Sequence, residues 1–280
     1  MPSPSERPGP PDFIGVGFAA RWWQSALFAH PQIQPPHAPG TALHFFDAFS
    51  GRDFDDADTA RYHAHFRMRE GAVTGEWTSR YFYDAWAPAL MRRAAPEARV
   101  IVLLNDPVEH FRHVYSARVI EPPEDGRPLH LADIVDRRAY ASHLTRLRRF
   151  YDPERILVLQ YERCRRDPLG QYHRTLRFLG VRDDFAPRRL RRRAAGKPES
   201  LLVGIGLRLG LPEGTRRRVN ERLGRRAPVE PAPLWPDLEA SLRATLDPEV
   251  EALRELVPDL DLSLWPTFAE LETKYAVRTI

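Results

Sequence analysis

The sequence has little cysteine, little lysine and no long apolar run, and each scarcity removes a class of protein. Cys164 is the single cysteine, which excludes an internal disulfide and a zinc ribbon. No apolar stretch reaches the roughly 20 residues that a membrane-spanning helix needs. The opening residues MPSPSERPGPPD have no apolar core, so they do not resemble a signal peptide. We therefore expect a disordered, Pro-rich lead-in over residues 1–11, no membrane partner and a cytoplasmic location.

Lysine occurs only at Lys197 and Lys274, which leaves 40 arginines among the 42 basic residues. A GC-rich genome is the simpler explanation for the surface as a whole. The functional explanation is anion binding, because the guanidinium group binds phosphate or sulfate bidentately. Arginine clusters at 163–166, 188–193 and 216–218 have no interleaved aromatic residues and match no nucleic-acid-binding module. We expect no nucleic-acid partner.

Apolar runs alternate with amphipathic stretches over the first 180 residues. This alternation predicts an α/β domain with a central parallel sheet. The run ARVIVLLND (98–106) is apolar almost throughout, as expected of a central strand buried on both faces. The predicted strands are 13–18, 42–49, 72–78, 98–106 and 155–162. The predicted helices are 22–29, 56–70 (capped by Asp56 or Asp58), 83–96, one from Pro107, 131–150, 168–181 closing on Gly180, and 235–257.

Ligands of parallel sheets bind at the carboxyl ends of the strands. This rule places four segments around one cleft: Gly17–Trp23, Asp47–Phe49, Thr78–Tyr83 and Asn105–His113. We expect a single domain over residues 12–280. Its Arg- and Pro-rich part, 182–234, could cover the cleft as a lid or lie on the surface, and 235–280 is its C-terminal helical part.

Several stretches, in this order and spacing, resemble PAPS-dependent sulfotransferases. PAPS, 3′-phosphoadenosine 5′-phosphosulfate, is the sulfuryl donor of that family. The resemblance is closest to bacterial members related to the heparan-type enzymes, and it implies a P-loop-like three-layer domain with the sulfotransferase fold. It covers residues 12–181 and returns at 261–271. The matching stretches are DFIGVG, AHPQI, LHFFDAF, GEWTSRYFYDAWAPALMRRAAPEARVIVLL, DPVEHF, LVLQYERCRRDPLGQYHRTLRFLGV and DLSLWPTFAEL.

The first loop departs from the family's pattern. The family has G-A-x-[KR]-[SAG]-G-[TS]-[TS], whose N–H groups and hydroxyls hold the phosphosulfate at a helix N-terminus. Here the loop is shorter and reads GFAARWW, without the Gly-Thr-Thr part. Arg21 is its only basic residue, and we expect Trp22 and Trp23 to fill the space where phosphate oxygens would lie. The three residues are predicted to form one wall of a remodelled pocket.

Two further donor-handling or catalytic positions also differ. The family's K-E-x-H-F-F-D, whose Glu is the implied general base, is replaced by TALHFFD, with Ala42 at the Glu position and His44 retained. The family's R-D-P-x-x-R-x-x-S, whose Arg and Ser hold the 3′-phosphate, is replaced by NDPVEHFRH, with Asn105 and His113 at those positions. Three or four lost bonds to charged groups, at about 1.5–3 kcal/mol each, would weaken donor binding by on the order of 10³–10⁶.

These departures lead to the hypothesis of a repurposed enzyme that no longer uses PAPS and needs no cofactor. It would act by acid/base chemistry, such as cyclisation, elimination or isomerisation, on a small molecule of the secondary-metabolite kind. The predicted catalytic residues are His44 and His113. The predicted substrate-binding residues are Arg21, Trp22, Trp23, Phe45, Glu76, Arg80, Tyr81, Asn105 and His110.

Two alternatives stay open. A divergent PAPS-dependent sulfotransferase acting on a small-molecule hydroxyl would need Arg21, Arg112 and Lys197 to replace the lost contacts. A non-catalytic pseudoenzyme would keep the fold only to bind a partner or metabolite. His110 and His113 are three residues apart, but no carboxylate or cysteine except Glu109 could complete a metal site, so none is predicted. Nothing in the sequence predicts an oligomeric state.

Overall fold

The centre of the protein is a five-stranded parallel sheet with strand order β3-β5-β2-β6-β7. The computed structural model describes residues 7–120, 131–194 and 233–271. The strands are β2 (Phe13–Gly17), β3 (Ile33–Gln34), β5 (Val73–Trp77), β6 (Arg99–Leu104) and β7 (Ile156–Gln160). All four neighbouring pairs are parallel, so the prediction of a central parallel sheet is confirmed.

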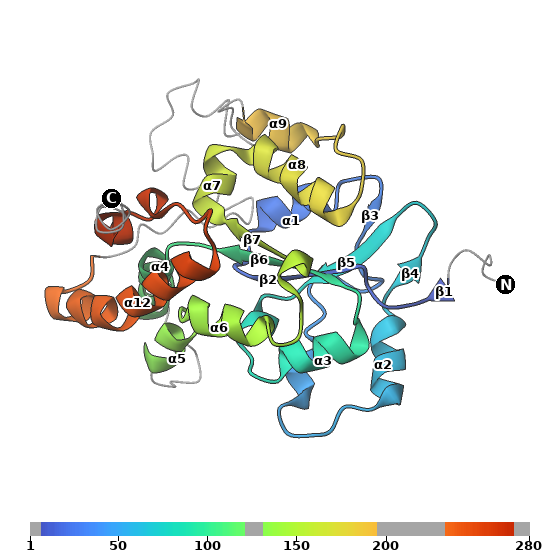
Figure 1. The fold of residues 1–280 in the computed structure, drawn as a ribbon, viewed down its shortest axis with the longest axis horizontal. Coiled ribbons are helices and arrows are strands. Elements are labelled where there is room, and N and C mark those ends of the chain that lie inside the picture. Colours follow the sequence, from blue (N-terminus) through green and yellow to red (C-terminus); the bar gives the residue numbers. More distant parts are fainter. Residues whose placement is uncertain (1–6, 121–130, 195–232, 272–280) are drawn as a thin grey trace.

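Helices cover both faces of the sheet, which gives the three layers that the sequence predicts (Figure 1). Alternate residues of β6 point into two hydrophobic cores on opposite faces of the sheet. Val100 and Val102 belong to the first core, and Ile101 and Leu103 belong to the second. The helices of the second core are α1 (Arg21–Leu27), α7 (Tyr161–Arg166), α8 (Pro168–Leu179) and α9 (Arg188–Ala194). Those of the first core are α2 (Asp56–His63), α3 (Ala87–Ala94), α4 (Pro107–Ile120), α5 (Leu131–Asp136), α6 (Tyr140–Leu147) and α12 (Pro236–Leu256).

The segment 42–49, predicted as a strand, is not one. His44 has a left-handed backbone with φ 53°, and Phe45–Phe49 form the short 3₁₀-helix η1. The apolar pattern was misleading because the backbone N–H groups of this segment bond to side chains and not to a neighbouring strand. The residues predicted at the end of this strand, Asp47–Phe49, therefore lie in a 3₁₀-helix.

Helix boundaries differ from the predictions in three places. The N-cap of α2 is Asp55, with Asp58 completing the capping box, and neither Asp56 nor Asp58 is the cap. That helix ends at His63, and Arg67–Met68 form β4, which pairs with β1 (Arg7–Pro8) inside the segment expected to be disordered. The single helix predicted over 131–150 is two helices, α5 and α6.

The C-terminal stretch DLSLWPTFAEL docks beside the end of β6. Trp265 is fully buried between the 3₁₀-helices η4 (Leu262–Leu264) and η5 (Pro266–Phe268). Its Nε1 donates to Glu162, whose other oxygen accepts from the backbone N–H of Asp106. Most of 182–234, the possible lid, lies outside the described residues. Within the described part of the chain, no helix combines the length and apolar character needed to cross a membrane.

Candidate functional site

The turn from β2 into α1 packs closely against the neighbouring strand β6. Gly17 has φ +83°, and a Cβ there would lie 2.4 Å from the carbonyl oxygen of Leu103. The N–H of Phe18 donates to that same oxygen at 2.6 Å, which ties the turn to β6. Ala20, at the N-cap of α1, has no side-chain oxygen with which to cap the helix. The turn therefore offers backbone groups but no hydroxyl or lysine for an anion.

Trp22 and Trp23 occupy different environments although they are neighbours in sequence. Trp23 is fully buried and packs edge-on against Tyr172, with ring centroids 6.3 Å apart. Trp22 is only partly buried and faces a cavity of about 700 Å³ between α1, α7 and α9. Of the two tryptophans predicted to form a pocket wall, only Trp22 lines this cavity.

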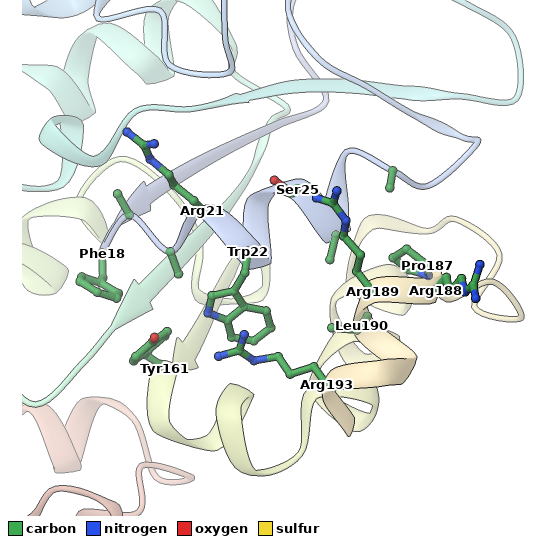
Figure 2. A pocket seen from close by; sticks show the side chains of 14 residues that line it. Phe18, Arg21, Trp22, Ser25, Tyr161, Pro187, Arg188, Arg189, Leu190 and Arg193 are labelled. Atoms are coloured by element: carbon green, nitrogen blue, oxygen red, sulfur yellow. The ribbon is translucent and has the colours of Figure 1, made fainter. Parts of the chain in front are cut away.

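The cavity combines aromatic walls with positive charge, as Figure 2 shows. Phe18, Trp22 and Tyr161 supply the aromatic surface, and the guanidinium carbon of Arg193 lies 4.0 Å from the centroid of the Trp22 ring. Arg21, Arg188 and Arg189 lie around it, and no acidic side chain is among its lining residues. Such a cavity is suited to an organic molecule with an apolar body and an anionic group.

His44 and Asp47 form a pair at the end of β5. The imidazole Nδ1 of His44 lies 3.0 Å from Asp47 Oδ2, and the His44 side chain is 55% exposed. The Nε of Arg80 lies 3.5 Å from the same Asp47 oxygen. A carboxylate at Nδ1 fixes the orientation of the ring, which leaves Nε2 as the ring nitrogen available to a substrate. Of the two histidines predicted to be catalytic, His44 has this arrangement.

His110 and His113, on α4, have different surroundings. The His110 ring packs against Phe18 with centroids 5.0 Å apart. Burial, together with the positive fields of Arg138, His113 and Arg137, lowers the pKa of His110 to about 3. His110 is therefore neutral at physiological pH and suits packing against a ligand better than taking a proton. His113 is exposed, and within the described residues it makes no hydrogen bond or ion pair.

Asn105, at the position where the family has arginine, is held inside the protein. It is 6% exposed, and its Oδ1 accepts a hydrogen bond from the hydroxyl of Tyr140 at 3.2 Å. Arg112 is paired with Glu109 at 2.7 Å. Lys197 lies outside the described residues. Among the residues the structure describes, no group of three or more His, Cys, Asp or Glu side chains is placed to share a metal ion.

Glu76 and Tyr81, predicted to contact the ligand, are both fully buried. The Tyr81 hydroxyl accepts a hydrogen bond from the backbone N–H of Phe45 at 2.7 Å, and Glu76 bonds to Tyr62 and Thr78. Phe45 is half-buried and packs against Tyr62. Glu76 and Tyr81 therefore hold the backbone of the His44 segment by hydrogen bonds from the protein interior. Tyr62 was not predicted from the sequence, because a single hydroxyl on a helix carries no local signal, whereas Thr78 begins one of the segments predicted at the cleft.

Comparisons with known proteins agree with the predicted fold. No family model matches the chain. Over 169 residues, covering 56% of this chain, it is 27% identical to human heparan sulfate glucosamine 3-O-sulfotransferase 3B1, of which the match spans 42%. It is 28% identical over 171 residues to human heparan sulfate glucosamine 3-O-sulfotransferase 6, spanning 47% of that protein. The chain thus spans less than half the length of these curated relatives.

A solved structure extends the likeness over nearly the whole chain. The crystal structure of a sulfotransferase from Alicyclobacillus acidocaldarius matches with a TM-score of 0.62 and 22% identity, covering 91% of this chain and 98% of that one. The protein therefore has the sulfotransferase fold. The sequence matches are likewise to sulfotransferases, over about half of this chain.

Proposed function

We propose that the protein is a sulfotransferase-fold enzyme that uses His44 and Asp47 for acid/base chemistry on a small organic molecule and does not use PAPS. The observation that carries this proposal is the 3.0 Å contact between His44 Nδ1 and Asp47 Oδ2, with the histidine side chain open to solvent. Ala42, at the position of the family's glutamate, cannot accept a proton. His44, two residues further along the chain, is the group to which we assign proton transfer.

In this mechanism Nε2 of His44 takes a proton from the substrate and later returns it to another substrate atom. The carboxylate of Asp47 stabilises the imidazolium between the two steps. No net proton or electron is consumed, so isomerisation, elimination or cyclisation needs no second substrate. A positioned general base of this kind contributes on the order of 10²–10⁴ to the rate. The aromatic, arginine-lined cavity beside Trp22, whose lining includes neither His44 nor Asp47, is a separate candidate site for an anionic molecule.

The residues at the donor positions do not fit PAPS as the family binds it. Phe18, Ala19 and Ala20 place no hydroxyl or ammonium group at the β2–α1 turn. The Asn105 carbonyl is engaged by Tyr140, and Arg112 is engaged by Glu109.

Sulfuryl transfer from PAPS to a small-molecule hydroxyl is the second candidate. It is favoured by the positive cavity at the same turn, where Arg21, Arg189 and Arg193 could take over contacts to phosphate groups. Homology to sulfotransferases points the same way. A non-catalytic binding role is the third candidate, and a cytoplasmic location stays a prediction.

Titration with PAP, the desulfated donor, separates the first two candidates. A ligand at 100 times its dissociation constant stabilises a fold by about 2.7 kcal/mol. We expect micromolar PAP to leave the melting temperature unchanged and to give no calorimetric heat. A clear shift would contradict the loss of PAPS use and favour sulfuryl transfer. Turnover of metabolite extracts, followed by mass spectrometry with His44→Ala as the comparison, then distinguishes an enzyme from a binding protein.

A further inference from the structure

The backbone around His44 is held by side chains from a distant part of the chain. Four successive N–H groups, those of residues 43–46, donate to buried side-chain oxygens. Leu43 donates to Glu76 Oε2 at 3.2 Å and to Thr78 Oγ1 at 3.1 Å, and His44 donates to Thr78 Oγ1 at 3.4 Å. The N–H groups of residues 45 and 46 donate to the Tyr81 hydroxyl at 2.7 and 3.4 Å.

The side chains that accept these bonds are themselves connected. The hydroxyls of Tyr62 and Thr78 each donate to Glu76 at 2.6 Å, one to each carboxylate oxygen. Tyr62, Glu76, Thr78 and Tyr81 are all fully buried. Because the Glu76 carboxylate accepts three bonds and donates none, the ionised form fits its surroundings. Buried networks with every member satisfied hold one geometry rigidly.

The segment that this network holds carries unusual backbone strain. His44 is the one non-glycine residue among those described that has a positive φ. Such a conformation persists only where the surroundings over-determine it, and it often marks a functional position. Here the bonds to residues 43–46 lie on both sides of His44, so they fix the backbone from which its imidazole reaches Asp47.

We propose that Glu76, with Thr78, Tyr62 and Tyr81, is a positioning residue that holds His44 in its left-handed conformation and so aims its ring at Asp47. This inference rests on the proposed role of His44 as the acid/base group. It assigns Glu76 a function other than contact with the ligand, since a fully buried carboxylate satisfied by three internal donors has no group left for a substrate.

The electrostatics of the network support a link to pH. Burial raises the pKa of Glu76 to about 7, while the hydrogen bonds from Thr78, Tyr62 and Leu43 and the field of His44 oppose the shift. The groups that face it are Tyr62 on α2, Tyr81 on the following 3₁₀-helix and His44 itself. The present partners of the Glu76 carboxylate, Leu43, Tyr62 and Thr78, all donate hydrogen bonds to it. Protonation turns one of its oxygens into a donor that faces these donors. We therefore expect the hydrogen-bond network that holds residues 43–46 to loosen as Glu76 becomes protonated.

The test is NMR of the protein labelled with ¹⁵N-histidine, with His44→Ala identifying the His44 ring signals. In the wild type, we expect the His44 shifts to change as Glu76 becomes protonated. Glu76→Gln should abolish that change and shift the Nδ1 resonance that reports the bond to Asp47. Thr78→Val and Tyr81→Phe should shift the same resonance, and they decide the matter if Glu76→Gln does not fold.

Two controls make the same substitutions away from the network. Thr175 is a fully buried threonine whose hydroxyl bonds within α8, and Glu162 is a partly buried carboxylate bonded to Trp265. Thr175→Val and Glu162→Gln should leave the His44 signals unchanged. His44 signals that are identical in the wild type, Glu76→Gln and Thr78→Val would overturn the proposal, as would equal shifts in the controls. Since the readout is not activity, it is independent of whether His44→Ala abolishes turnover.

Discussion

The indole of Trp77 lies directly over Gly15 on the neighbouring strand. The two residues are register partners in the β2–β5 pair, and a Cβ on Gly15 would come within 2.2 Å of Cε3 of Trp77. The glycine is therefore required by a close approach and not by its backbone conformation. It leaves room on this face of the sheet for the buried ring of Trp77, the residue immediately before Thr78 of the network that holds His44.

This contact predicts that Gly15→Ala destabilises the fold by about 1–3 kcal/mol, the usual cost of overpacking. Urea denaturation measures the change in the free energy of unfolding. Gly51→Ala is the matched control, because nothing lies within 4 Å of a Cβ at Gly51. If the clash is the cause, Gly15→Ala should cost less in a Trp77→Leu background, as expected for residues in contact. Additive effects would contradict this explanation.

The buried carboxylate predicts a pH dependence of stability. The pKa of Glu76 is raised from 4.5 to about 7 on folding, so between these values the folded state binds more protons than the unfolded state. Stability therefore falls as pH rises through this window, by at most about 3 kcal/mol from this residue. Its contribution is constant below and above the window.

Glu76→Gln isolates that contribution. Glu162 and Asp106 also have raised pKa values from burial, so the wild-type curve alone sums several groups. The difference between the wild-type and Glu76→Gln unfolding free energies should change with pH between about 4.5 and 7 and be flat outside. A difference that is constant over the whole range would mean that Glu76 titrates normally in the fold.

The end of α8 predicts a graded response to substitution. Gly180 has φ +74°, and its N–H and that of Val181 satisfy the last carbonyls of the helix. A left-handed conformation costs a non-glycine L-residue about 1–2 kcal/mol, and asparagine tolerates it better than alanine. Thermal denaturation should rank wild type above Gly180→Asn, and Gly180→Asn above Gly180→Ala. Equal stability of the two variants would show that the backbone relaxes there.

The sequence was sufficient where local chemistry decides the structure. The apolar runs of β6 and β7 predict strands buried on both faces, and Gly180 predicts the end of α8. In contrast, nothing local distinguishes ALHFFDAF from a strand, because its conformation is set by Glu76, Thr78 and Tyr81, which lie more than 30 residues away in the chain. For the same reason the sequence identified Glu76 and Tyr81 as site residues but assigned them contact with the ligand.

The division between Trp22 and Trp23 shows a second limit of sequence reasoning. Adjacent residues on a helix point about 100° apart, so two neighbouring tryptophans need not share one environment. One of them faces the core and the other the cavity. The sequence does not reveal which, because that depends on how α8 and α9 pack against α1.

The two tryptophans should therefore respond very differently to truncation. Trp23→Ala removes a fully buried ring from the core and should cost about 3–5 kcal/mol. Trp22→Ala should cost clearly less, because one side of this ring borders the cavity and the guanidinium of Arg193 rather than packed core. Chemical denaturation of both variants measures the contrast. If Trp22→Ala proved as costly as Trp23→Ala, Trp22 would be a core residue, and the cavity between α1 and α9 would not exist in solution.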